Sequence, residues 1–133
     1  MKQLIYLNLF ILIFCACQKE NNARDFNGTY TRSFRTIVDQ KMISSDFELE
    51  LAPQKFEVKK GLKLGNGTFK VIDTKTINFE DKNIWTADFD WNLILNGSYT
   101  YEAKGDSLIL TKNLENSQNT IYNYYQYRLR RNN

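Results

Sequence analysis

The sequence predicts an all-β fold, a single antiparallel meander β-barrel of about eight strands, with a β-sandwich as the alternative. Apolar and polar residues alternate with a period of two over most of the chain after residue 25, which is typical of half-buried strands. Eight Tyr, nine Phe and two Trp residues favour strands over helices. Closing a barrel removes exposed strand edges, but a sandwich shows the same alternation.

The first 16 residues have the parts of a secretory signal peptide. Lys2 precedes an apolar run over residues 4–14, and the small residue Ala16 precedes Cys17. This end resembles a lipobox, in which the Cys is acylated before cleavage, although Phe14 stands where Leu is usual. We therefore expect residues 1–16 to be a lipoprotein signal peptide and Cys17 to be lipidated. The alternatives are a plain secreted protein and a transmembrane anchor, for which the apolar run is short.

Residues 17–25 are expected to form a flexible tether between the lipid and the domain, because residues 18–22 are all polar. With Glu20 after Lys19, this stretch resembles the export signal of lipoproteins that reach the outer face of the outer membrane. We expect a lipid-anchored outer-membrane protein, on the cell surface or on the periplasmic face. Two or three acyl chains would hold it firmly.

The domain over residues 26–133 contains the alternating runs. Each run places apolar side chains on one parity and charged or hydroxyl side chains on the other, so one face of the sheet is dry and the other is wet. The runs cover residues 47–51, 56–58, 69–71, 77–79, 85–89, 99–103, 108–110 and 125–129.

Turn residues separate these runs. The pairs Asn66-Gly67 and Asn96-Gly97 are typical of tight turns, as is the tripeptide around Gly105, because Asn and Gly tolerate positive φ. Pro53 removes a backbone donor and predicts a bend, a bulge or a strand boundary.

Composition argues against several functional classes. Both Cys residues, 15 and 17, belong to the signal region, so we expect no disulfide in the domain. The chain has no His, which removes the commonest metal ligand and general base and makes a Ser-His-Asp triad impossible. The net charge of +3, without a basic block among aromatics, predicts no nucleic-acid partner. We expect no catalytic residue, metal or cofactor, and interpret Asp88 and Asp90 as solvated strand-edge charges.

Two segments carry a resemblance to a known family. Phe26-Asn27-Gly28-Thr29-Tyr30 is similar to the opening of the first lipocalin strand, where lipocalins proper have Trp in place of Tyr30. Residues 91–110 are similar to a later hairpin of small bacterial lipoproteins. Over residues 26–130 the chain thus resembles the lipocalin-like domains of such lipoproteins. The resemblance implies a barrel that takes an apolar ligand, with Arg128 or Arg130 packed across Tyr30.

Two functions remain open, and we expect a monomer in both. In the first, the barrel binds a small apolar ligand. The candidate pocket residues are then the inward-parity aromatics Phe69, Phe79, Trp85, Phe89, Tyr101 and Tyr125, although for each of them core packing is favoured over a pocket role. In the second, the barrel is filled and the chain is a non-catalytic interaction or structural lipoprotein. Its protein partner would then contact residues 113–120 or the segment around Trp91.

Overall fold

The computed structural model describes residues 24–38, 40–86, 88–114 and 123–133, the side chains of Asn113 and Asn123 excepted. The predicted signal peptide and the predicted lipidation site at Cys17 lie outside this range, as do residues 115–120 of the predicted contact loop. None of the helices in the described ranges has the length and hydropathy needed to cross a membrane.

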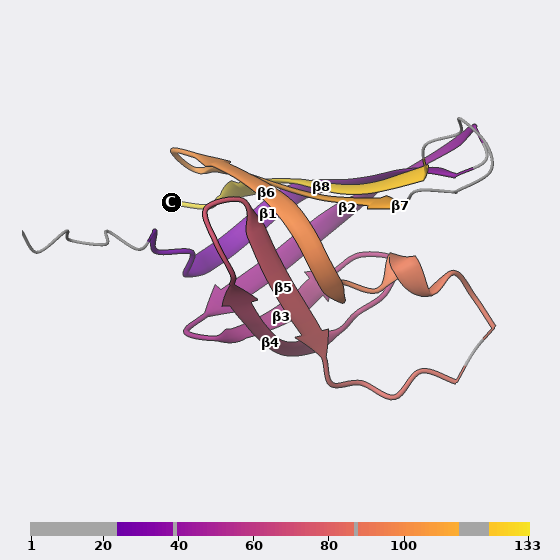
Figure 1. Ribbon diagram of the computed structural model, residues 1–133, viewed down its shortest axis with the longest axis horizontal. Helices are drawn as coiled ribbons and strands as arrows, with labels where there is room; N and C mark the ends of the chain where they lie inside the picture. The colour runs from indigo at the N-terminus through magenta and orange to yellow at the C-terminus, as the bar shows by residue number, and fades with distance from the viewer. Residues whose placement is uncertain (1–23, 39, 87, 115–122) are drawn as a thin grey trace, which may run out of the picture.

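The described residues form a closed barrel in which each strand pairs antiparallel with the next and the last pairs with the first (Figure 1). The prediction of an antiparallel meander barrel is therefore confirmed, and the sandwich alternative is wrong. A single turn of 3₁₀ helix, η1 (Trp91–Leu93), precedes the sixth strand. The strands are β1 (Gly28–Val38), β2 (Lys41–Ala52), β3 (Lys55–Lys60), β4 (Asn66–Val71), β5 (Thr76–Asp81), β6 (Gly97–Lys104), β7 (Ser107–Leu114) and β8 (Asn123–Arg131).

The barrel has two different ends (Figure 1). Residues 24–27 enter at one end, together with the tight β2–β3, β4–β5 and β6–β7 turns; we call it the N-terminal end. The β1–β2 turn and the longer connections over residues 61–65 and 82–96 lie at the opposite end, which we call the loop end.

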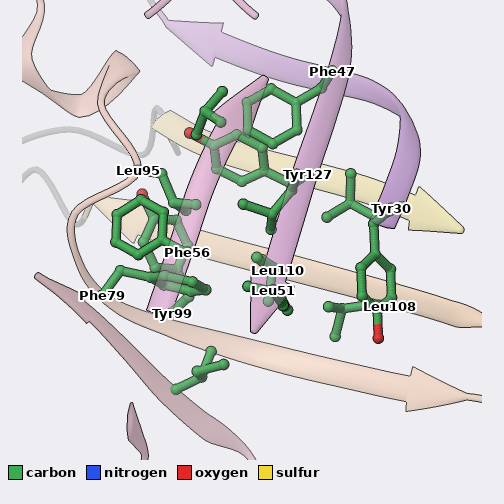
Figure 2. Close-up of a cluster of buried hydrophobic side chains, with 14 of the residues drawn as sticks. Tyr30, Phe47, Leu51, Phe56, Phe79, Leu95, Tyr99, Leu108, Leu110 and Tyr127 are labelled. Carbon is green, nitrogen blue, oxygen red and sulfur yellow. The ribbon is translucent and has the colours of Figure 1, made fainter. Parts of the chain in front are cut away.

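Side chains of inward parity fill the barrel (Figure 2). The Tyr127 ring packs against Phe34, Phe47 and Tyr99, with ring centroids 4.7, 4.6 and 5.9 Å apart. Such tilted and edge-on pairs add to the stabilisation from burial itself. Aliphatic side chains complete the core, among them Leu49, Ile77 and Leu110, each 0% exposed.

The turns agree with the sequence at two of the predicted positions. Residues 53–54 form the tight β2–β3 turn, so the boundary predicted at Pro53 is confirmed. Gly105, at φ +55, occupies the β6–β7 turn as predicted. The turn predicted at Asn66-Gly67 is wrong, because both residues belong to β4. Gly67 is there for close approach instead: a Cβ at this position would lie 1.9 Å from the backbone oxygen of Glu80.

The strand predicted over residues 85–89 is also wrong. Residues 82–86 and 88–90 lie outside any strand, and β5 pairs directly with β6. The indole Nε1 of Trp85 donates to the Asp81 carboxylate, and the Trp85 ring packs edge-on against Phe89. These aromatic side chains therefore contact each other at the loop end instead of pointing into the barrel from a strand.

An arginine does cover the Tyr30 ring, but at a different position from the two that the resemblance implies. The guanidinium carbon of Arg131 lies 5.4 Å from the ring centroid, and its Nη2 donates to the Tyr30 hydroxyl at 2.8 Å. Arg128 and Arg130 are exposed, because they alternate with the buried Tyr127 and Leu129 and so face outward. Arg131 is on the inward parity at the N-terminal end, where it closes the barrel over Tyr30.

Candidate functional site

The structure separates the six predicted pocket residues into three places. Phe79 and Tyr125 are buried in the core, at 1% and 2% exposure. Phe69 and Tyr101 lie at the N-terminal end, where each is partly buried against the core. Trp85 and Phe89 lie on residues 82–96 at the loop end. The six rings therefore do not line one common pocket.

Three aromatic rings pack in a row at the loop end. Phe89 and Trp91 are stacked, with ring centroids 5.4 Å apart and planes inclined by 9°. Trp85 meets Phe89 edge-on at 5.8 Å. Trp91 is 54% exposed, so one end of the row is open to solvent. The segment around Trp91, predicted as a contact surface if its ring proves exposed, meets that condition.

Residues 61–65 extend this apolar surface. The ammonium of Lys63 lies 3.8 Å from the centroid of the Phe89 ring, in a cation–π contact that joins the two loops. Leu62 and Leu64 flank Lys63 and remain 45% and 58% exposed. We define the aromatic patch as the apolar side chains of these two loops, namely Leu62, Leu64, Ile84, Trp85, Phe89 and Trp91.

Carboxylates hold the patch in place. Asp90 caps η1, since its Oδ1 accepts from the backbone N–H of Asn92 at 3.0 Å. Its other oxygen accepts from the hydroxyl of Tyr125 on β8, which ties residues 82–96 to the barrel wall. Burial, together with the negative charge of Asp90, raises the pKa of Tyr125, so this hydroxyl remains a donor at neutral pH. The patch is thus presented on a fixed support.

Sequence reasoning missed Leu62, Leu64 and Ile84. Leu62 and Leu64 lie between Gly61 and Gly65. Apolar residues inside this turn-like Gly-Leu-Lys-Leu-Gly stretch are the sequence feature that could have indicated an exposed apolar loop. Ile84, 91% exposed, has no such signal because it directly precedes a run that was interpreted as a strand.

A cleft of about 620 Å³ opens at the N-terminal end, a volume within the range of small-ligand sites. Phe26 is buried beside it, with its ring edge-on to Tyr101 at 5.4 Å, and plugs the barrel. Phe69 is the only predicted pocket residue among those that line the cleft. The lining residues are Arg24, Asp25, Phe26, Asn27, Gln54, Thr68, Phe69, Lys70 and Val71.

Among the residues that the structure describes, neither end gathers the groups that metal binding requires. Within the described ranges, no set of three or more His, Cys, Asp or Glu side chains could hold a metal ion. Asp90 is engaged by Tyr125 and by the cap of η1. Lys112 is partly buried nearby, and desolvation lowers its pKa while the charge of Asp90 opposes that effect; its Nζ donates to the backbone oxygen of Asn96 at 2.6 Å.

No protein-family model matches the chain, and no curated protein or solved structure is significantly similar to it.

Proposed function

We propose that this chain is a non-catalytic, lipid-anchored lipoprotein of the outer membrane that binds a protein partner through the aromatic patch. The observation that carries the proposal is the contrast between the two regions of the barrel. Its interior is filled by packed side chains, whereas Trp91, Ile84 and Leu64 leave 54%, 91% and 58% of their surface in water. Exposed apolar side chains gathered on two neighbouring loops are typical of interaction sites.

The patch has the properties of a binding hot spot. Trp is among the residues most enriched in such spots, and burying apolar surface contributes roughly 25 cal/mol per Å². Its rings are fixed by stacking, by the Lys63 contact and by Asp90, so little conformational freedom remains to be lost on association. Met42 and Ile43, 68% and 49% exposed on β2 beside the β1–β2 turn, add apolar surface to the same end of the barrel.

Anchoring rests on the sequence pattern around Cys17. The positive start, the apolar run and the Ala16-Cys17 pair favour acylation, and the acyl chains then place the domain at a membrane surface. A partner in the envelope would meet the protein at high local concentration, so a modest patch suffices for useful occupancy.

Site-specific photocrosslinking in the source organism tests this function. A photoreactive residue at position 84, inside the aromatic patch, should form a discrete crosslinked protein band, and Trp91→Ala should abolish that band. The control is the same residue at position 128, which is exposed on the outer face of β8 between the two ends and should give no such band. Equal crosslinking from both positions, or none from position 84, would contradict the proposal.

A small apolar ligand is the second candidate function, and the cleft at the N-terminal end is the observation that favours it. Phe26, Phe69 and Val71 supply an apolar floor, and polar residues surround it. Native mass spectrometry of gently purified protein should then show an extra mass that is lost on denaturation. Phe69→Trp would fill the cleft and remove the extra mass, whereas Trp85→Phe at the other end would leave it unchanged. A bare protein mass in the wild type would count against this function.

A further inference from the structure

The position of the proposed lipid anchor limits how the barrel can face the membrane. Cys17 precedes Arg24, the first described residue, by seven positions, so the connecting chain spans at most about 25 Å. β1 has 11 residues, which extend over roughly 36 Å along the strand. Because barrel strands tilt by about 35–45°, the N-terminal end and the loop end lie roughly 25–30 Å apart. Only a fully extended tether would let the loop end reach the lipid surface, so the anchor favours the N-terminal end at the membrane.

The N-terminal end exposes apolar side chains on its β4–β5 hairpin. Ile72 is 54% exposed and Val71 38% exposed, and Val71 also lines the cleft beside Phe26. Hydrogen bonds close the hairpin turn, because the Asp73 carboxylate accepts from the backbone N–H groups of Lys75 and Thr76, at 2.8 and 2.7 Å. The Tyr101 hydroxyl fastens it to β6 by donating to the Asp73 backbone oxygen at 3.0 Å.

Several cations lie near these apolar side chains, as do the exposed carboxylates of Asp25 and Asp73. Lys70 and Lys75 flank the hairpin tip, and both are exposed. Arg24 is exposed between this hairpin and the β6–β7 turn, because it lines the cleft and also donates to the backbone oxygen of Gly105. Lys104, also exposed, precedes that turn. Exposed apolar residues with cations beside them are complementary to the acyl chains and phosphates of a phospholipid surface.

We propose that the N-terminal end of the barrel lies on a phospholipid surface, with Ile72 and Val71 inserted and the neighbouring cations against lipid phosphates. This orientation rests on the lipidation of Cys17, which belongs to the proposed function. It directs the aromatic patch away from the membrane, toward a partner. The acyl chains hold the protein at the bilayer, and the hairpin fixes its orientation there.

Fluorophores attached to the lipidated protein in vesicles test this orientation. The chain has no Cys after position 17, so Thr74→Cys at the hairpin and Ile84→Cys at the aromatic patch can each be labelled specifically. The vesicles contain phosphatidylethanolamine and phosphatidylglycerol, some of it brominated on the acyl chains. Emission from position 74 should shift to the blue and be quenched by the brominated lipid, whereas emission from position 84 should remain that of a label in water.

Substitutions then assign the effect to named side chains. Ile72→Asp should abolish the shift at position 74. Met42→Asp, at an exposed apolar residue of the other end, should leave the shift intact. A shift at position 84, or no shift at position 74 in protein that floats with the vesicles, overturns the orientation alone. Protein that does not float with the vesicles lacks the anchor, and this result would contradict both the anchoring and the orientation. Circular dichroism of each variant separates these outcomes from unfolding.

Discussion

Arg32 has an unusual backbone for a residue in the middle of a strand. Its φ is +153°, although its cross-strand partners Phe47 and Leu129 are both buried. By parity an extended residue here would point its side chain into the core, and the positive φ turns the guanidinium outward instead. It lines a shallow cleft of about 230 Å³ with Lys104 and Arg130. Such a conformation costs a non-glycine residue about 1–3 kcal/mol.

Replacing Arg32 with glycine should therefore stabilise the protein. Arg32→Gly removes the strain, and glycine in a strand costs only about 0.5–1 kcal/mol, so we expect a net gain of about 1 kcal/mol in the free energy of unfolding. Arg35→Gly is the control, because Arg35 is exposed on the same strand without a positive φ. Urea denaturation should show opposite signs for the two variants. An equal loss in both would mean that Arg32 is not strained.

Gly67 is required for a steric reason and not for its backbone conformation, because its missing side chain leaves room for the neighbouring strand β5. Gly67→Ala places a Cβ 1.9 Å from the backbone oxygen of Glu80, and the β4–β5 pair must separate to accept it. We expect a loss of about 3 kcal/mol, the upper part of the range for overpacking. Gly105→Asn is the control, since a Cβ at Gly105 meets nothing within 4 Å and Asn tolerates φ +55. Thermal unfolding should separate the two variants clearly, and similar midpoints would contradict the close contact.

At the scale of elements, residues 82–96 show where alternation predicts structure correctly and where it does not. An alternation with a period of two indicates on which face of a strand each side chain would lie. It does not indicate whether a neighbouring strand is available for pairing. β5 and β6 pair with each other from Phe79 and Gly97 onward, so the segment between them has no strand to pair with. Its aromatics pack together at the loop end instead. The exposure of Trp91 depends on this arrangement, so the sequence predicts the residue as a candidate but not its surroundings.

Asp90 attaches this segment to the barrel wall. Asp90→Ala removes both the cap of η1 and the acceptor for the Tyr125 hydroxyl, which then remains in a largely buried position without its partner. We expect the free energy of unfolding to fall by about 2 kcal/mol. Asp88→Ala, exposed two residues earlier, should change it little. Hydrogen exchange of the Leu93 and Ile94 amides should accelerate only in Asp90→Ala; unchanged exchange would mean that Asp90 does not hold the segment.

At the scale of the whole molecule, closure of the barrel depends on every strand at once. β1 pairs with β8 over eight consecutive positions, from Tyr30 with Arg131 to Ile37 with Tyr124. Closure requires the tilt and stagger of all strands to agree. No pattern within a single strand determines whether they do. The sequence therefore predicts strands and a dry interior, while the choice between a barrel and a sandwich needs the complete set of registers.

The filled barrel also predicts how the molecule responds to alkali. Burial raises the pKa of Tyr99 and of Tyr127 above the usual value of 10, and Tyr127 is raised further by its Tyr99 neighbour. The folded state thus keeps protons that the unfolded state loses above pH 10, so the stability these groups contribute is present below pH 10 and lost as the pH rises beyond it. Between its unfolded and its folded pKa, each such tyrosine lowers the free energy of unfolding by about 1.4 kcal/mol per pH unit.

We therefore expect cooperative unfolding above pH 10, with tyrosinate absorbance appearing together with the loss of near-ultraviolet circular dichroism. Tyr127→Phe should delay this transition. It should also leave stability at pH 7 nearly unchanged, because the Tyr127 hydroxyl is buried without a hydrogen-bond partner among the described residues. Tyr124→Phe is the control, since Tyr124 is only partly buried. If all tyrosines instead titrated near pH 10 while the protein stayed folded, the core would be open to water and the interior could not be regarded as filled.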